Sequence, residues 1–141
     1  MIRRLLLSRH EGNIADILGT SLCLIILLTV LLTTIQYMRI LNIKRAVENT
    51  GREYLLYLEE QGELKSNQLT DLRTKLTGMG FADSSIEVTY NENNTRKGYA
   101  QEVSLQIHIN ATRHEMGLSP VAGFVRDRYV INCRLCSIAK H

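Results

Sequence analysis

The residue types that most often do chemistry in proteins are few in this sequence and widely spaced. The histidines are His10, His108, His114 and His141. The sequence has no nucleophile elbow, no zinc-protease motif, no phosphate-binding loop and no dinucleotide-binding glycine pattern. A metal pair formed by His108 and His114 is conceivable, but polar surface histidines are far commoner. We therefore expect no enzymatic activity, no cofactor and no metal site.

Two of the three cysteines, Cys133 and Cys136, form a C-x-x-C pair. Such a pair is redox-active at a helix N-terminus and binds zinc when a second pair is present. Neither context is found here. The pair lies in an alternating segment, and in a strand residues three apart point to opposite faces and lie about 10 Å apart. That separation is too large for a disulfide, so we interpret both residues as ordinary strand cysteines.

The elements that must position any functional residue begin with an uncharged apolar run from Ile17 to Met38. A helix over this run is about 33 Å long, at about 1.5 Å per residue, which is enough to cross a hydrocarbon core of about 30 Å. The alternative is a secretory signal peptide, whose apolar region is about 7 to 15 residues and ends in small residues. This run is longer and ends in bulky Tyr37 and Met38, so we predict a retained transmembrane helix.

The helix is predicted to continue beyond the membrane, because the apolar residues then recur on one helical face. These residues are Ile40, Ile43, Val47, Tyr54 and Leu58. The charged residues expected on another face are Lys44, Glu48, Arg52 and Glu59. Gly51 is a weak point that costs about 1 kcal/mol relative to alanine, and Gly62 is a typical C-terminal stop. The sequence thus predicts one helix over residues 13–61, transmembrane in its first half and amphipathic in its second.

Residues 62–141 are predicted to form a small head of the α+β class. Ser66 is expected to cap a short helix that ends near Gly78 and buries Leu69, Leu72 and Leu76. Phe81 and Ala82 would then return the chain to the core.

Three segments of the head alternate with period two, which predicts a three-stranded antiparallel sheet packed on the long helix. Their apolar residues are Ile86, Val88 and Tyr90; Val103, Leu105, Ile107 and Ile109; and Tyr129, Ile131, Cys133 and Leu135. The loop over residues 111–125 is unusually apolar, with Met116, Leu118, Val121 and Phe124 around Gly117, Pro120 and Gly123. This loop is either a partner-binding patch or a segment folded under the sheet.

Composition and charge limit the partners. The net charge is +3, there are two Phe and no Trp, and the charges of the head are mixed. No basic face or aromatic platform points to nucleic acid. Residues 1–12 form a short basic leader. Lys and Arg flank the apolar run on both sides, so the positive-inside rule does not decide its orientation.

Asp16 lies at the edge of the apolar run. An acid at the centre of a bilayer would cost roughly 2.5 to 3.5 kcal/mol, but at the edge it can reach water. One interpretation is an acid that favours the N-terminal end of the helix dipole. The other is a functional carboxylate.

The N-terminal plan resembles that of type IV pilin-like proteins. The residues that carry the resemblance are Arg9, Glu11, Gly12, Ile14 and Asp16, followed by the apolar run. The chain looks most like the TadE-like minor pseudopilins of tight-adherence (Flp) pilus systems and related small pilin-like membrane proteins of Gram-positive bacteria. Over the head, the resemblance is one of architecture alone.

This resemblance implies a structural subunit of a bacterial pilus or secretion apparatus. It implies that a prepilin peptidase cuts after Gly12 on the cytoplasmic side and leaves Asn13 as the new N-terminus. Asp16 would pair with the terminal amine of a neighbouring pilin-like subunit as the helices assemble in the lipid bilayer. The leader would lie in the cytoplasm and the head outside the cell membrane.

The sequence departs from the family pattern at one point. The family acid is usually a glutamate at the fifth position after the cut, whereas Asp16 is an aspartate at the fourth and is followed by Ile17. A cut between Glu11 and Gly12 would restore the spacing. The alternative function is therefore an uncleaved single-pass membrane protein whose extracytoplasmic head binds a partner.

Overall fold

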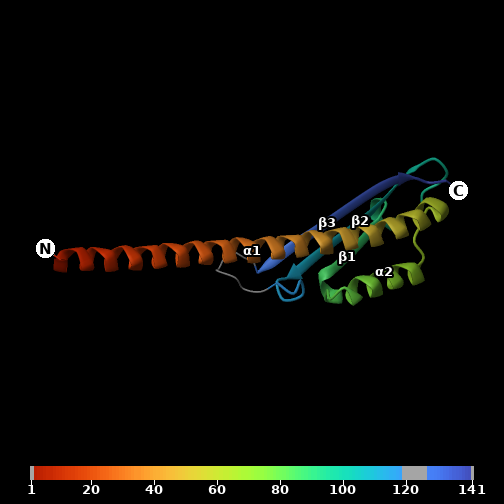
Figure 1. Ribbon diagram of the computed structural model, residues 1–141. Helices are drawn as coiled ribbons and strands as arrows, with labels where there is room; N and C mark the ends of the chain where they lie inside the picture. The colour runs from red at the N-terminus through yellow and green to blue at the C-terminus, as the bar shows by residue number, and fades with distance from the viewer. Residues whose placement is uncertain (1, 119–126, 141) are drawn as a thin grey trace. The chain divides into compact units, whose positions relative to one another are not determined.

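The computed structural model has an α+β fold with two helices and three strands (Figure 1), and it describes residues 2–118 and 127–140, with side chains from residue 14 onward. The chain divides into two compact units, Met1–Tyr37 and Met38–His141. The first unit contains the N-terminal part of helix α1. The second unit, which we call the head, contains the rest of that helix and all later elements.

Helix α1 spans Ile2–Gln61. It therefore begins at Ile2 rather than at Asn13, the predicted start. The reason is local: residues 2–12 contain no proline and are rich in leucine and arginine, which are strong helix formers. Gly12 costs about 1 kcal/mol in a helix, which is too little to end one that is well supported on both sides.

The C-terminal end of α1 is confirmed by the structure. Gly62 has a φ of +70°, a conformation that glycine adopts without strain. Its N–H donates to the carbonyl of Leu58 at 2.8 Å and so satisfies one of the terminal carbonyls of the helix.

Helix α2 spans Ser66–Gly78 and confirms the predicted short helix, but its cap differs. Lys65 is the N-cap residue, with extended φ and ψ angles of −68° and 155°, and Ser66 is already helical. The N–H of Lys65 donates to Oε1 of Gln68 at 2.9 Å. A glutamine at the third helical position thus reaches back over the helix start, as in one half of a capping box.

The three strands form the predicted antiparallel meander, in the order β1-β2-β3. Strand β1 spans Ile86–Tyr90, β2 spans Glu102–Thr112 and β3 spans Arg128–Ile138. Two short 3-10 turns, η1 at Asp83–Ser85 and η2 at Glu92–Asn94, lie on either side of β1. The register between β2 and β3 is unbroken from Glu102↔Ile138 to Thr112↔Arg128.

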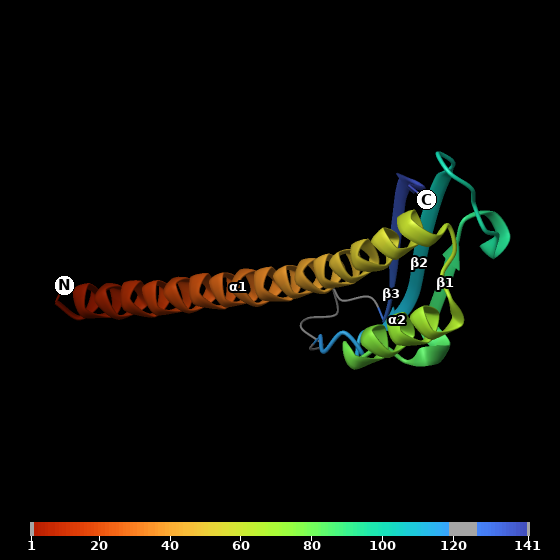
Figure 2. The same ribbon diagram turned by 90° about the vertical axis from the view of Figure 1, so that its right-hand side faces the viewer.

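Within the head, the last part of α1 and all of α2 cover one face of the sheet (Figure 2). The largest fully buried side chains come from α1, α2, β2 and the turn after β2: Val47, Tyr54, Leu58, Leu72, Leu76, Val103, Leu105, Ile107, Ile109 and Met116. The opposite face of the sheet carries the exposed members of each alternation. One apolar face therefore suffices, as the sequence predicts.

The predictions for Phe81 and Ala82 and for the apolar loop after β2 are confirmed only in part. Phe81 is buried, but Ala82 is exposed because the chain turns outward there into η1. Met116 and Leu118 are buried, so this part of the apolar loop folds under the sheet. The other loop residues named above, Val121, Phe124, Pro120 and Gly123, lie outside the described residues.

Gly51 is a point of close approach between α1 and the sheet. A Cβ atom at this position would lie 3.0 Å from Cδ1 of Leu135 and 3.1 Å from Cδ1 of Ile107. Such distances are shorter than ordinary carbon contacts of about 3.5 to 4.0 Å. The residue that the sequence marks as a weak point in the helix is thus the one that allows helix and sheet to pack.

Glu59 was predicted to lie with Lys44, Glu48 and Arg52 on a face other than the apolar one, but it is buried, with only 7% of its surface exposed. Nζ of Lys140 lies 2.6 Å from its Oε2, and the Lys140 N–H donates to the Glu59 carbonyl at 2.7 Å. The side-chain hydrogen bond from Lys140, with a second from Ser137, holds the pKa of the Glu59 carboxyl below its ordinary value of 4.5. The chain end is therefore bonded to the end of α1 by both backbone and side chain.

Candidate functional site

The most prominent functional feature is the exposed apolar part of α1. From Ile14 onward α1 is long and apolar enough to cross a membrane, by length and composition, and none of the side chains in its most apolar stretch is buried. Leu18, Leu24 and Leu27 are each 65% exposed or more. The core helix of a soluble protein would be mostly buried. This exposed apolar segment is therefore a candidate membrane span.

The threonines of this segment satisfy their own hydroxyl groups. Each donates to the carbonyl of a residue three or four positions earlier in the same helix, over distances of 2.5 to 3.0 Å. The residues are Thr20, Thr29, Thr33 and Thr34. Hydrocarbon offers no hydrogen-bond partners, so a polar side chain in it must find one within the protein. These threonines were not among the predicted functional residues, although their position in a predicted apolar helix could have indicated this bonding.

The predicted processing junction lies inside a helix. Gly12 and Asn13 both belong to α1, whose backbone is helical on either side of them. Asp16 follows Gly12 by four residues, about one helical turn, and its side chain is exposed. No ion pair of the described residues includes Asp16. The described residues thus leave the Asp16 carboxylate exposed at the edge of the apolar segment.

The two cysteines of the C-x-x-C pair are separated by the sheet, as the sequence predicts. Cys133 is buried on the helix-covered face, Cys136 is exposed on the other, and both are free thiols. Burial raises the pKa of the Cys133 thiol, and the nearby carboxylate of Glu48 raises it further. Cys133 is therefore a neutral packing residue and a poor nucleophile.

The structure describes the side chains of the two histidines that were considered as a metal pair, His108 and His114. Nδ1 of His108 lies 2.8 Å from Oδ1 of Asn132 on the neighbouring strand, on the exposed face of the sheet. His114 is exposed in the turn after β2. Among the described residues, no group of three or more His, Cys, Asp or Glu side chains is placed to hold a metal ion. The side chains of His10 and His141 lie outside the described part.

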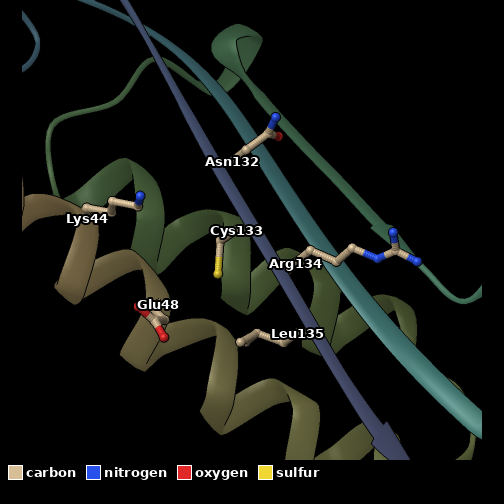
Figure 3. A pocket seen from close by; sticks show the side chains of 6 residues that line it. All are labelled: Lys44, Glu48, Asn132, Cys133, Arg134 and Leu135. Carbon is tan, nitrogen blue, oxygen red and sulfur yellow. The ribbon is translucent and has the colours of Figure 1, made fainter.

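A pocket of about 200 Å³ lies between α1 and β3 in the head. Figure 3 shows Lys44 and Glu48 on the helix, with Cys133 and Leu135 pointing toward it from β3, while Asn132 and Arg134 point to the other side of the strand. Because its lining comes from segments roughly 90 residues apart, no local sequence pattern could have revealed it.

Comparison with known proteins adds no identification: no family model, no curated protein and no solved structure matches this chain.

Proposed function

We propose that this protein is a pilin-like, TadE-like structural subunit of a bacterial pilus or secretion apparatus. The observation that carries the proposal is the single helix α1, which serves two environments. Its first part presents apolar side chains on every side and turns its threonine hydroxyls inward. Its last part supplies one face of the core of a small α+β head. A subunit that inserts and assembles through its N-terminal helix needs this arrangement.

In this proposal the leader lies in the cytoplasm and the head lies outside the cell membrane. A prepilin peptidase cuts between Gly12 and Asn13. Because this junction is helical, the peptidase must first unwind the turn around Gly12, which glycine makes easier by about 1 kcal/mol. Asp16 then pairs with the terminal amine of an adjacent subunit. A carboxylate and an ammonium are each costly to remove from water, and pairing offsets much of that cost.

Intact-mass measurement of the membrane form tests the processing step. The expected mass is that of a chain beginning at Asn13, in cells that carry a prepilin peptidase. A chain that keeps residues 1–12 in such cells would contradict cleavage and favour an uncleaved anchor.

Replacing the carboxylate tests the assembly step. Asp16→Asn is expected to reduce recovery of the protein in the assembled fraction and to leave its membrane insertion intact. Asp83→Asn, in an exposed turn of the head, is the matched control. Equal recovery of the Asp16→Asn variant and the wild type would remove the proposed role of Asp16.

The second candidate is an uncleaved single-pass membrane protein whose head binds a partner. One observation favours it specifically. Strand β3 pairs on one side only within the described residues, so the head offers a strand edge to another chain.

A further inference from the structure

The hydrogen-bond phase of β3 shows which of its backbone groups face outward. The Arg113 N–H donates to the Asp127 carbonyl at 3.0 Å, and the Ala139 N–H donates to the Gln101 carbonyl at 2.9 Å. The register is unbroken between these points, and in an antiparallel pair bonded and non-bonded positions alternate. Odd-numbered residues of β3 therefore bond to β2. The even-numbered residues turn their N–H and C=O groups to the outer edge: Arg128, Val130, Asn132, Arg134, Cys136 and Ile138.

This edge differs from the other edge of the sheet. Strand β1 has five residues and β3 has eleven. The same alternation turns the backbone of Tyr90 outward on β1, but its N–H already donates to Oδ1 of Asn94 at 2.9 Å. Short length, proline, bulges and charged side chains are usual ways of protecting a sheet edge from further pairing. Over residues 128–138, β3 is long and contains no proline and no bulge, and its charged side chains are Arg128 and Arg134.

The helix layer has room for one more strand beneath it. Helices α1 and α2 lie side by side, joined by the Tyr54 hydroxyl donating to Asp71 and by the Lys75–Glu53 ion pair at 2.9 Å. Two adjacent helices cover roughly 20 Å, whereas three strands at about 4.8 Å spacing cover only about 14 Å. The pocket between Lys44, Glu48 and residues 132–135 lies where α1 extends past the edge of β3 (Figure 3).

A strand added beside β3 would have different side chains next to each of its two faces. On the helix side, β3 contributes the apolar residues Cys133 and Leu135 to the pocket, and α1 contributes Lys44 and Glu48, which carry opposite charges. On the open side β3 carries exposed Arg128 and Arg134, and β3 has no acidic residue between them. No ion pair of the described residues includes either arginine. An added strand would therefore meet apolar side chains of β3, flanked by Lys44 and Glu48 of α1, on one face and positive charge on the other.

We propose that the free edge of β3 is a docking site for an extended segment of a partner protein in which apolar and acidic side chains alternate. The segment adds to the sheet as a fourth strand next to β3. Its backbone pairs with the even-numbered residues, its apolar side chains enter the pocket under α1, and its carboxylates face Arg128 and Arg134. The site belongs to the head alone and is independent of assembly through the apolar part of α1.

The test uses the full chain in lipid nanodiscs and a capped peptide that alternates valine and glutamate. Amide hydrogen exchange is followed residue by residue by NMR. In the free protein, the odd-numbered amides of β3 should be protected and the even-numbered ones should exchange fast. The peptide should protect the amides of Val130, Asn132 and Arg134 and leave the amides of β1 unchanged. No added protection at the even-numbered positions would overturn the proposal.

Two variants separate edge pairing from non-specific adhesion. Asn132→Pro removes an N–H that faces the edge, a place where strands tolerate proline, and should abolish binding while the odd-numbered amides stay protected. Arg134→Glu should weaken the glutamate peptide several-fold and strengthen a valine–lysine peptide. Arg73→Glu, on the exposed side of α2, is the control and should change neither. If the wild type bound the valine–glutamate and valine–lysine peptides equally well, the proposal that the partner segment carries acidic side chains would be wrong.

Other occupants of the edge would give distinct results in the same experiment. Even-numbered amides that are protected in the free protein, and that lose this protection on dilution, would identify a second copy of the chain as the occupant. Protection that is present at every protein concentration would mean that the chain covers its own edge. Either result would overturn the proposal of a separate partner, and neither would affect the proposed assembly through α1.

Discussion

In residues 14–37 of α1, apolar side chains point in every direction and stay exposed, whereas residues 38–61 bury an apolar face that includes Val47, Tyr54 and Leu58 and leave Leu56 and Tyr57 exposed. The backbone is the same helix throughout. The difference lies in what surrounds the side chains: the second part packs against a sheet, whereas the first part is a candidate membrane span whose side chains are exposed. Matched substitutions in the two parts should therefore have different effects on the stability of the head.

The largest difference is expected for leucine. Leu58→Ala should lower the free energy of unfolding of the head by about 2–5 kcal/mol, as for other buried leucines, because no surface of Leu58 is exposed. Leu24→Ala, at a position that is 67% exposed in the first part, should leave head stability unchanged. Urea unfolding of the full chain in detergent micelles measures both. Equal losses would mean that the two parts of the helix do not differ in the way described.

Glycine gives the next difference. Gly51→Val should cost about 1–3 kcal/mol, the usual penalty of overpacking, since a Cβ there would already lie 3.0 Å from Leu135. Gly19→Val is the control, because nothing lies within 4 Å of a Cβ at Gly19. Thermal unfolding of the head followed by the near-ultraviolet signal of its tyrosines compares them. A Gly51→Val head as stable as the wild type would refute the close helix–sheet contact.

Within the second part of α1, buried and exposed charges should also differ. Glu59→Gln should destabilise the head by about 1–2 kcal/mol at neutral pH, because it replaces a charge-assisted bond to Lys140. Its neighbour Glu60 is exposed, so Glu60→Gln should have little effect.

The pH dependence of the Glu59 variant has a defined sign. The folded-state pKa of Glu59 is lowered, so its contribution is present at neutral pH and is lost as the pH falls through 4.5 and below. In the Glu59→Gln variant, the free energy of unfolding should therefore fall less than in the wild type as the pH is lowered. A variant that loses as much stability as the wild type between neutral pH and acid would place the titrating group elsewhere.

The smallest effect is expected for the exposed pair Glu48–Arg52, whose nitrogen and oxygen atoms are 2.9 Å apart. Arg52→Gln should cost only about 0.3–0.5 kcal/mol, and less at high salt. A double-mutant cycle with Glu48→Gln measures the pair itself. A coupling energy above about 1 kcal/mol would show that the pair does more than an exposed helical pair usually does.

The parts of the fold that could be predicted from the sequence are those with a local signal. Strand alternation located β2 and β3, and Gly62 located the end of α1, because each depends on neighbouring residues only. The burial of Glu59 could not be predicted, since its partner Lys140 is 81 residues away. The packing role of Gly51 was hidden for the same reason: Leu135 and Ile107 meet it only in the folded head.

The candidate sites also divide into those with a local sequence signal and those that depend on the assembled fold. The long apolar helical segment was predicted, because its length and composition are visible in the sequence, and it is a candidate membrane span. The free edge of β3 was not, because the number of strands beside it and the phase of its hydrogen bonds are properties of the assembled sheet. The roles of Gly12, Asn13 and Asp16 stay predictions that depend on partners outside the chain.

The three native cysteines offer the most direct test of the two environments of α1. In the protein alone, Cys23 and Cys136 are exposed and Cys133 is buried. If residues 17–38 cross the membrane with the head outside, a membrane-impermeant maleimide applied to intact cells should label Cys136 alone, and detergent should then expose Cys23. Intact mass and fragment mapping read the result. Labelling of Cys23 as fast as that of Cys136 in intact cells would contradict the membrane span on which the account depends.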